Sequence, residues 1–218
     1  MNTFKNEDGK DILMCMVESI QKNKDYLGEI DGLIGDGDHG MNMNKGFTVF
    51  KERFGEADFS FTEGLEELGM ILLNEIGGSM GPIYGTVFME MAEAGEDAQD
   101  IDVQTYGKML RAGLCGLQDI VDAQVGDKTL VDSLSPAVDA IEFAASKDVG
   151  FVDALESMKK AARDGRDTTK NMVAKFGRSS RLGERSRGVL DAGATSCCIL
   201  LESMADGITE KLLQGEKK

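Results

Sequence analysis

Two aspartates separated by one residue lie in a glycine-rich stretch, LIGDGDHGMNMNKG, that spans residues 33–46. Asp36 and Asp38 are joined by Asp31 just upstream. Carboxylates ~6 Å apart repel one another by roughly 3 kcal/mol per pair at an effective dielectric near 20, so a nearby anion requires cations between them. Mg²⁺ suits this role because it binds a few carboxylates and completes its shell with phosphate oxygens. The pattern therefore predicts a metal site, while an acidic turn bonded to its own backbone remains the alternative.

Other chemistries fit this stretch less well. A calcium-binding EF-hand loop starting at Asp36 would need glycine at its sixth position and glutamate at its twelfth, but Met41 and Phe47 stand there. His39, the only histidine, fits a helix start or a core position better than a catalyst, because no Ser-His-Asp or Cys-His arrangement can be assigned. GDKT at 126–129 lacks the adjacent Gly-Lys pair of a phosphate-binding Walker A loop.

Helical periodicity dominates the chain, whereas sustained alternation typical of strands is scarce. Three apolar stripes are clear, and further helices are expected over about 82–94, 103–122, 129–146, 150–175 and 192–213. The stripes are Ile12, Met16 and Ile20; Met43, Phe47, Phe50 and Phe54; and Leu65, Leu68, Leu72 and Ile76. We predict an all-α, up-and-down bundle of eight helices, a single domain over 1–218, with its longest connection from Gly177 to Asp191.

The glycines are distributed unevenly among the connections. Five clusters, at 35–40, 77–81, 126–129, 177–188 and 191–196, occupy the connections before the second, fourth, sixth and eighth helices. In an up-and-down bundle these connections all lie at one end. The other end receives ordinary polar turns, FGEADFSFT, AGEDAQDID and ASKDVG. This asymmetry indicates a functional site at the glycine-rich end.

That end can bind an anion, because four helices begin there and their first N–H groups lack helical partners. Pro82 fits the start of the fourth helix. Thr195 and Ser196 have hydroxyls that fit either a phosphate contact or, preferably, a helix cap. The arginines of the last connection fit a phosphate clamp or surface ion pairs equally well; they are Arg178, Arg181, Arg185 and Arg187.

Composition and charge limit the classes of protein to which this chain could belong. The 218 residues are 41% hydrophobic and carry a formal charge of −15, which argues against nucleic acid as a partner. No apolar run approaches the roughly 20 residues of a membrane span, and the start MNTFKNEDGKD is polar, so we expect a cytoplasmic protein without a membrane partner. The four cysteines lack zinc spacing and are expected as small buried residues; they are Cys15, Cys115, Cys197 and Cys198.

Five stretches in register resemble the L subunit of dihydroxyacetone kinase: IGDGDHGMNMNKGF, GGSMGPIYGT, GDKTLVDSL, GRSSRLGERS and DAGATS. The resemblance covers nearly the whole chain. It implies an eight-helix antiparallel barrel with ADP (or ATP) and two Mg²⁺ at one end. It also implies that Asp31, Asp36 and Asp38 are the Mg²⁺ ligands.

The resemblance further implies which residues contact the nucleotide. Phosphate contacts would come from His39, Gly40, Met41, Asn42, Ser79, Met80 and Arg178, with Thr86 in support. Val121 and Leu130 would line the adenine side, and Asp191, Ala192 and Gly193 would close over the nucleotide. Arg178 would also be the catalytic residue. Met80 and Ala192 depart from the family pattern, which more often has a small hydroxyl residue and a proline there.

Members of this family differ in the source of the phosphoryl group that they transfer. Because the sequence ends at Lys218 without a substrate-binding K domain, it resembles the bacterial version with separate subunits. There, bound ADP accepts a phosphoryl group from a histidine of a phosphotransferase-type M subunit and passes it to dihydroxyacetone on a K subunit. Two alternatives remain: an ATP-exchanging subunit for another short ketose such as erythrulose, and a non-catalytic paralogue that binds a transcriptional regulator.

Overall fold

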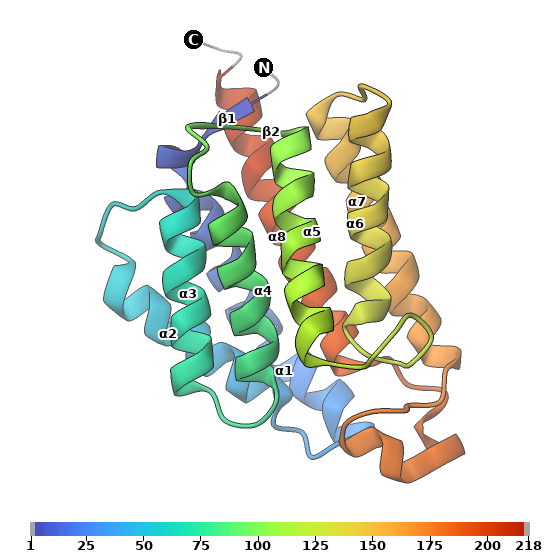
Figure 1. The fold of residues 1–218 in the computed structure, drawn as a ribbon. Helices are drawn as coiled ribbons and strands as arrows, with labels where there is room; N and C mark the ends of the chain where they lie inside the picture. Colours follow the sequence, from blue (N-terminus) through green and yellow to red (C-terminus); the bar gives the residue numbers. More distant parts are fainter. Residues whose placement is uncertain (1–2, 216–218) are drawn as a thin grey trace.

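The computed structural model describes residues 3–215, in which eight α-helices run alternately up and down (Figure 1). They are α1 (Lys10–Ile34), α2 (His39–Phe54), α3 (Phe61–Glu75), α4 (Met80–Gly95), α5 (Val103–Ile120), α6 (Val131–Ser146), α7 (Phe151–Thr168) and α8 (Ala192–Gly215). Each helix packs against the next, and α8 packs against α1, which closes the ring. The predicted all-α antiparallel barrel is confirmed. The prediction of a single domain over 1–218 also includes residues 1–2 and 216–218, which lie outside the described residues.

The apolar stripes form the barrel core. Ile12, Met16 and Ile20 of α1 are fully buried, as are Phe47 and Phe50 of α2. Residues three or four apart share one helix face, so each stripe turns inward as a unit. Burial of each such side chain stabilises the fold by roughly 1.5–3 kcal/mol. Among residues 3–215, no helix has both the length and the apolar content needed to cross a membrane.

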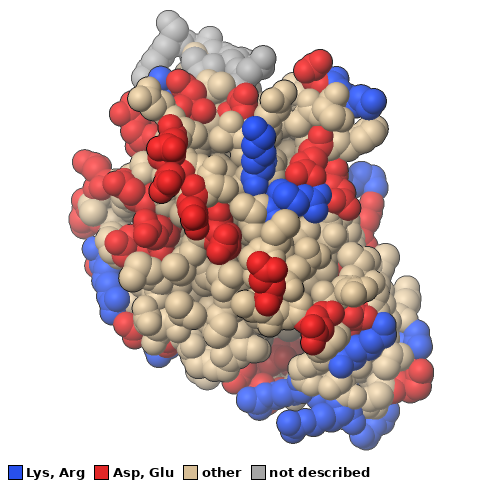
Figure 2. All heavy atoms as spheres, viewed as in Figure 1, with Lys and Arg blue, Asp and Glu red and all other residues tan. Residues whose placement is uncertain are grey.

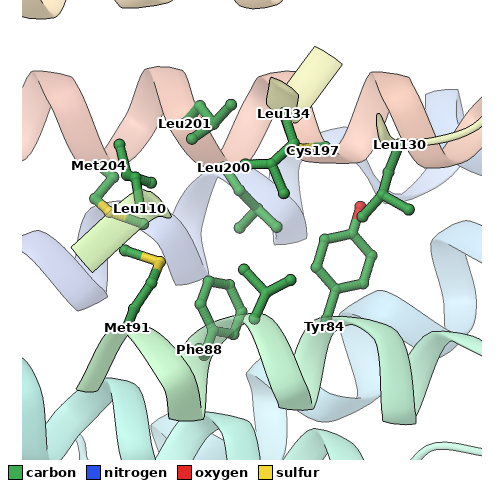
Figure 3. A pocket seen from close by; sticks show the side chains of 11 residues that line it. Tyr84, Phe88, Met91, Leu110, Leu130, Leu134, Cys197, Leu200, Leu201 and Met204 are labelled. Atoms are coloured by element: carbon green, nitrogen blue, oxygen red, sulfur yellow. The ribbon is translucent and has the colours of Figure 1, made fainter. Parts of the chain in front are cut away.

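A small apolar cavity of about 20 Å³ remains inside the barrel, between α4, α5, α6 and α8 (Figure 3). Tyr84 and Leu130 lie toward one end of it, and the oxygen of Tyr84 points toward α8 (Figure 3). The space is comparable to that occupied by about one water molecule. This cavity is therefore small, and beside it the hydroxyl of Tyr84 reaches the glycine-rich end of α8.

The end opposite the glycine clusters is closed by features that the sequence reading missed. Strands β1 (Thr3–Lys5) and β2 (Asp100–Asp102) pair antiparallel, with Phe4 opposite Ile101. Both of these side chains are buried, and the Phe4 ring lies 5.5 Å from that of Phe61. A short 3-10 turn, η1 (Asn6–Asp8), then leads into α1. Strands of three residues are too short to show alternation, which explains the omission.

The helix predicted over 150–175 is too long. The α-helix ends at Thr168 and continues only as one 3-10 turn, η2 (Thr169–Asn171). The hydroxyls of Thr168 and Thr169 donate to carbonyls three residues back, which tightens the last turn. The predicted connection from Gly177 to Asp191 also contains structure, the 3-10 segment η3 (Arg178–Ser186).

The expectation of four buried cysteines is only partly correct. Cys197 and Cys198 are buried, Cys15 is half-buried and Cys115 is exposed. Cys115 follows the buried Leu114 on α5, and a single helical step turns it away from the core. All four thiols are free.

Candidate functional site

All glycine-rich connections gather at one end of the barrel, as predicted from their order along the chain (Figure 1). Every glycine with positive φ in residues 3–215 lies in these connections: Gly37, Gly78, Gly126, Gly177, Gly183 and Gly188. Most of them face open space, since a Cβ added at Gly78, Gly126 or Gly177 would meet nothing within 4 Å. The glycines therefore shape these loops and leave the backbone accessible.

The three predicted metal ligands come together at this end. Asp31 lies in the last turn of α1, Asp36 in the following connection and Asp38 at the N-cap position of α2. Each contributes a carboxylate oxygen, and these oxygens all lie within 4.8 Å of one another. Gly37 between them has φ +77°, which turns the chain so that both flanking carboxylates reach Asp31. Three hard oxygen donors at this spacing fit Mg²⁺.

Arg178 connects the last loop to this acidic cluster. It begins η3, and its guanidinium forms an ion pair with the carboxylate of Asp36. The arginine side chain is 64% exposed, so it can move between the carboxylate and a nearby anion. Basic residues gather at this corner of an otherwise acidic molecule, where Figure 1 places the 178–186 segment (Figure 2).

His39 is buried at the start of α2, beside the acidic cluster. Its Nε2 lies 2.8 Å from the hydroxyl oxygen of Ser196, and its backbone N–H donates to Asp31 at 3.4 Å. Burial lowers the pKa of His39 to about 4, against the opposing charge of Asp38. The imidazole is therefore neutral near pH 7 and serves to join α2 to α8.

Ser196 is the centre of a buried polar chain. Its hydroxyl lies 2.6 Å from the Tyr84 hydroxyl, which also donates to the Gly193 carbonyl at 3.1 Å. Burial raises the pKa of Tyr84 well above its usual value, so the phenol stays protonated. The chain His39–Ser196–Tyr84 fixes the starts of α2, α8 and α4 relative to one another.

Several helices begin without a side-chain cap, among them α1 and α7 at the end opposite the glycine clusters. At the opposite end, Ser60 and Asp102 cap α3 and α5 with their side chains, at 3.2 Å and 2.7 Å. At the glycine-rich end, the N-cap residues of α2, α4 and α6 make no side-chain cap bond. Their first N–H groups, together with the helix dipoles, form a suitable environment for an anion.

Asp191 is half-buried at the start of α8. Its Oδ2 accepts a hydrogen bond from the Ala194 N–H at 2.7 Å. Burial raises the pKa of Asp191 to about 7, against this hydrogen bond and the charge of Lys128. A carboxylate retained at such cost is typical of functional sites.

Comparison with known proteins now places the chain. The model of a family described as the DAK2 domain matches residues 33–206. The chain belongs to the DAK2 domain family.

Similar proteins include two bacterial subunits. The chain is 37% identical to the ADP-binding subunit of a phosphoenolpyruvate-dependent dihydroxyacetone kinase from Listeria innocua, covering 86% of this chain and 89% of that protein. It is 36% identical to the corresponding subunit of Escherichia coli, covering 83% and 87%. The solved dihydroxyacetone kinase of C. freundii, in complex with AMP-PNP and Mg²⁺, shares the fold with a TM-score of 0.69 and 19% identity. That match covers 94% of this chain but only 35% of the larger kinase chain.

Within the DAK2 domain, the predicted nucleotide contacts are only partly brought together. Leu130 lies against the start of α8. A Cβ atom added to Gly193 would lie 3.5 Å from the backbone nitrogen of Leu130. Ser79 and Met80 begin α4, with Ser79 exposed. Val121 follows the end of α5 at the same end, where it packs, partly buried, against the hydrophobic core that includes Leu130.

Three predicted residues have packing roles in the DAK2 domain. A Cβ on Gly40 would lie 1.9 Å from the Lys24 carbonyl oxygen, so glycine is needed for α2 to approach α1. Ala192 is buried at the start of α8. Thr86 lies further along α4 and packs against α5, since a Cβ atom added to Gly116 of α5 would lie 3.2 Å from the Cγ2 of Thr86. Met41 is exposed and Asn42 half-buried on the first turn of α2.

Sequence reasoning missed several residues of the DAK2 site. Tyr84 lies three residues after the glycine cluster at 77–81, and Lys128 lies inside the cluster at 126–129, but tyrosine and lysine have no spacing that marks such a role. Ser196 is expected to cap the helix, but its hydroxyl instead donates to the Gly193 carbonyl within α8 and contacts His39. Thr195 does not cap the helix either: its hydroxyl donates to the Asp191 carbonyl at 2.7 Å, and it is the Asp191 side chain that accepts from a free N–H, that of Ala194.

Proposed function

We propose that this chain is the ADP-binding subunit of a dihydroxyacetone kinase whose phosphoryl group originates from phosphoenolpyruvate. The names of the two bacterial relatives support this, since each match covers most of both proteins. The observation that carries the proposal is the cluster of Asp31, Asp36 and Asp38 beside helix starts without side-chain caps, with Arg178 paired to Asp36.

The residues at this end suit the proposed cofactors. Asp31, Asp36 and Asp38 would hold two Mg²⁺, which supply positive charge to offset that of the nucleotide phosphates. The first turns of α2 (His39–Asn42) and of α4, with Ser79 and Met80, offer backbone N–H groups for phosphate oxygens. Val121 and Leu130 would provide apolar surface for the adenine, and Asp191, Ala192 and Gly193 would close over the nucleotide.

In this proposal the nucleotide remains bound and acts as a carrier. It would accept a phosphoryl group from the phosphohistidine of an M-type subunit and deliver it to dihydroxyacetone on a K-type subunit. Arg178 is the proposed catalytic residue, because its exposed guanidinium can neutralise charge on the transferred group. His39, buried and neutral, positions the start of α2.

A second candidate is a subunit that exchanges its nucleotide with ATP for a short ketose such as erythrulose. The C. freundii complex supports this second candidate, because the AMP-PNP bound there is an analogue of a nucleoside triphosphate. The two candidates differ in how long the nucleotide stays bound.

Native mass spectrometry of the purified chain in Mg²⁺ tests the proposal. We expect the mass of one ADP with two Mg²⁺, retained when excess labelled ATP is added. Rapid replacement by ATP would favour the second candidate. A chain that binds neither nucleotide, even when both are supplied, would refute both.

A further inference from the structure

Lys128 is a lysine inside the protein. Only 1% of its surface is exposed, although it lies in the short connection between α5 and α6. Its ammonium donates to the Thr169 carbonyl at 2.7 Å, to the Val189 carbonyl, and to the Met172 carbonyl at 3.5 Å. An ammonium has three N–H donors and no acceptor, so three carbonyls satisfy it.

These acceptors belong to two segments far apart in sequence from Lys128. Thr169 and Met172 follow the end of α7, and Val189 lies two residues before Asp191. Two further hydrogen bonds join the same segments: the Asp191 N–H donates to the Thr169 hydroxyl at 3.0 Å, and the Gly188 N–H donates to the Lys170 carbonyl at 2.7 Å. Lys128 thus holds the chain that leads into Asp191.

The turn that carries Lys128 is itself fixed. The carboxylate of buried Asp132 accepts hydrogen bonds from the N–H groups of Gly126 and Thr129, at 2.6 Å and 2.8 Å. Lys128 between them has φ +63°, a left-handed conformation uncommon for lysine. Such a conformation persists only when the surroundings enforce it, and it clusters at functional sites.

A second buried lysine shows that burial alone does not explain this arrangement. Lys159 of α7 is 9% exposed and pairs with the carboxylates of Glu156 and Asp206, each at 2.7 Å. Those partners lie within α7 and α8, so Lys159 joins helix to helix. Lys128 instead uses backbone carbonyls to hold a loop at the candidate site.

We propose that Lys128 is a positioning residue that holds residues 188–193 against the end of α7, so that Asp191 and Gly193 stay closed over the bound nucleotide. This inference rests on the proposed function. It predicts that Lys128 sets the dissociation rate of the nucleotide without contacting it.

The test compares the wild type, Lys128→Met and the control Lys159→Met. Radiolabelled ADP bound in Mg²⁺ is chased with excess unlabelled ADP, and amide hydrogen exchange and thermal unfolding are measured alongside. Loss of the ammonium removes its hydrogen bonds to three carbonyls and weakens the closed loop, so we expect dissociation to be roughly ten-fold faster in Lys128→Met. Faster amide exchange should be confined to residues 188–194. Lys159→Met should lose stability yet keep the wild-type dissociation rate.

Equal dissociation from the wild type and Lys128→Met would overturn this inference alone. The inference would also be overturned if Lys159→Met, at an equal loss of stability, released ADP as fast as Lys128→Met, because faster dissociation would then be a general effect of destabilisation. A wild-type chain that binds no ADP overturns both the proposed function and the inference. Should Lys128→Met fail to fold, Lys128→Asn replaces it with the same expected and contrary results, because asparagine tolerates left-handed backbone.

Discussion

The imidazole Nε2 of His39 and the hydroxyl oxygen of Ser196 lie 2.8 Å apart, although 157 residues separate them in the sequence. This hydrogen bond joins the first turn of α2, beside the acidic cluster, to the first turn of α8, beside Asp191. The two sides of the candidate site are therefore held at a fixed distance by a buried polar contact.

Replacing Ser196 by alanine should destabilise the fold. The buried imidazole would lose its partner, at a cost of about 1–3 kcal/mol. Ser203→Ala is a matched control on the same helix, because the buried Ser203 hydroxyl bonds only to the local Leu200 carbonyl in residues 3–215. Urea unfolding should show the larger loss for Ser196→Ala. Equal losses would mean that the contact with His39 contributes no stability.

Asp191→Asn should stabilise the nucleotide-free protein at higher pH. Burial raises the pKa of Asp191 from 3.8 to about 7 in the fold, so ionisation costs stability progressively as pH rises between these values. Asparagine caps a helix as well as aspartate and carries no charge. Relative to the wild type, the variant should gain at most about 4 kcal/mol at about pH 8 and little near pH 4.

Urea unfolding at several pH values, in chelator and without nucleotide, measures this difference. Asp139→Asn on α6 provides a comparison at an exposed carboxylate. A constant difference between Asp191→Asn and the wild type across the pH range would show that Asp191 titrates normally in the fold.

Arg178→Ala should impair phosphoryl transfer more than nucleotide binding. Arginines that neutralise charge on a transferred phosphoryl group contribute about 10³–10⁵ in rate, so we expect a loss of at least that lower order. Arg181→Ala changes another exposed arginine of the same segment and should retain activity. Transfer is measured with K-type and M-type subunits added. Comparable rates for the two variants would remove Arg178 from the catalytic role.

Thiol reactivity should follow burial. Cys115 is exposed and should react rapidly with a disulfide reagent in the folded protein. Burial raises the pKa of Cys198 to about 12, and Cys197 is also buried, so both should react only after unfolding. Reaction counted with and without denaturant, using Cys115→Ser as control, checks this. Fast modification of Cys197 or Cys198 in the native protein would show that α8 opens readily.

The barrel and the gathering of the glycine-rich connections at one end could be predicted because they depend on local signals. Stripes such as Ile12, Met16 and Ile20 determine which face of a helix is buried, and the order of the glycine clusters determines which connections share an end. The strand pair containing Phe4 and Ile101 could not be found this way, since three residues show no periodicity.

The site could be predicted where its residues are close in sequence. Asp31, Asp36 and Asp38 lie within eight positions, and one turn brings them together. By contrast, the partners of His39 and Lys128 come from α8 and from the segments around α7. Such contacts depend on how the ring of helices closes, which no local spacing reveals.

The proposed function depends most directly on nucleotide binding by Asp31, Asp36 and Asp38 through Mg²⁺. Isothermal titration of ADP, in Mg²⁺ and in chelator, tests it with the wild type, Asp36→Asn and the control Asp58→Asn from the opposite end. We predict tight binding by the wild type and Asp58→Asn that chelator abolishes, and affinity at least ~100-fold weaker, about 2.7 kcal/mol, in Asp36→Asn. Binding of ADP by Asp36→Asn at wild-type affinity, unchanged by chelator, would contradict the account.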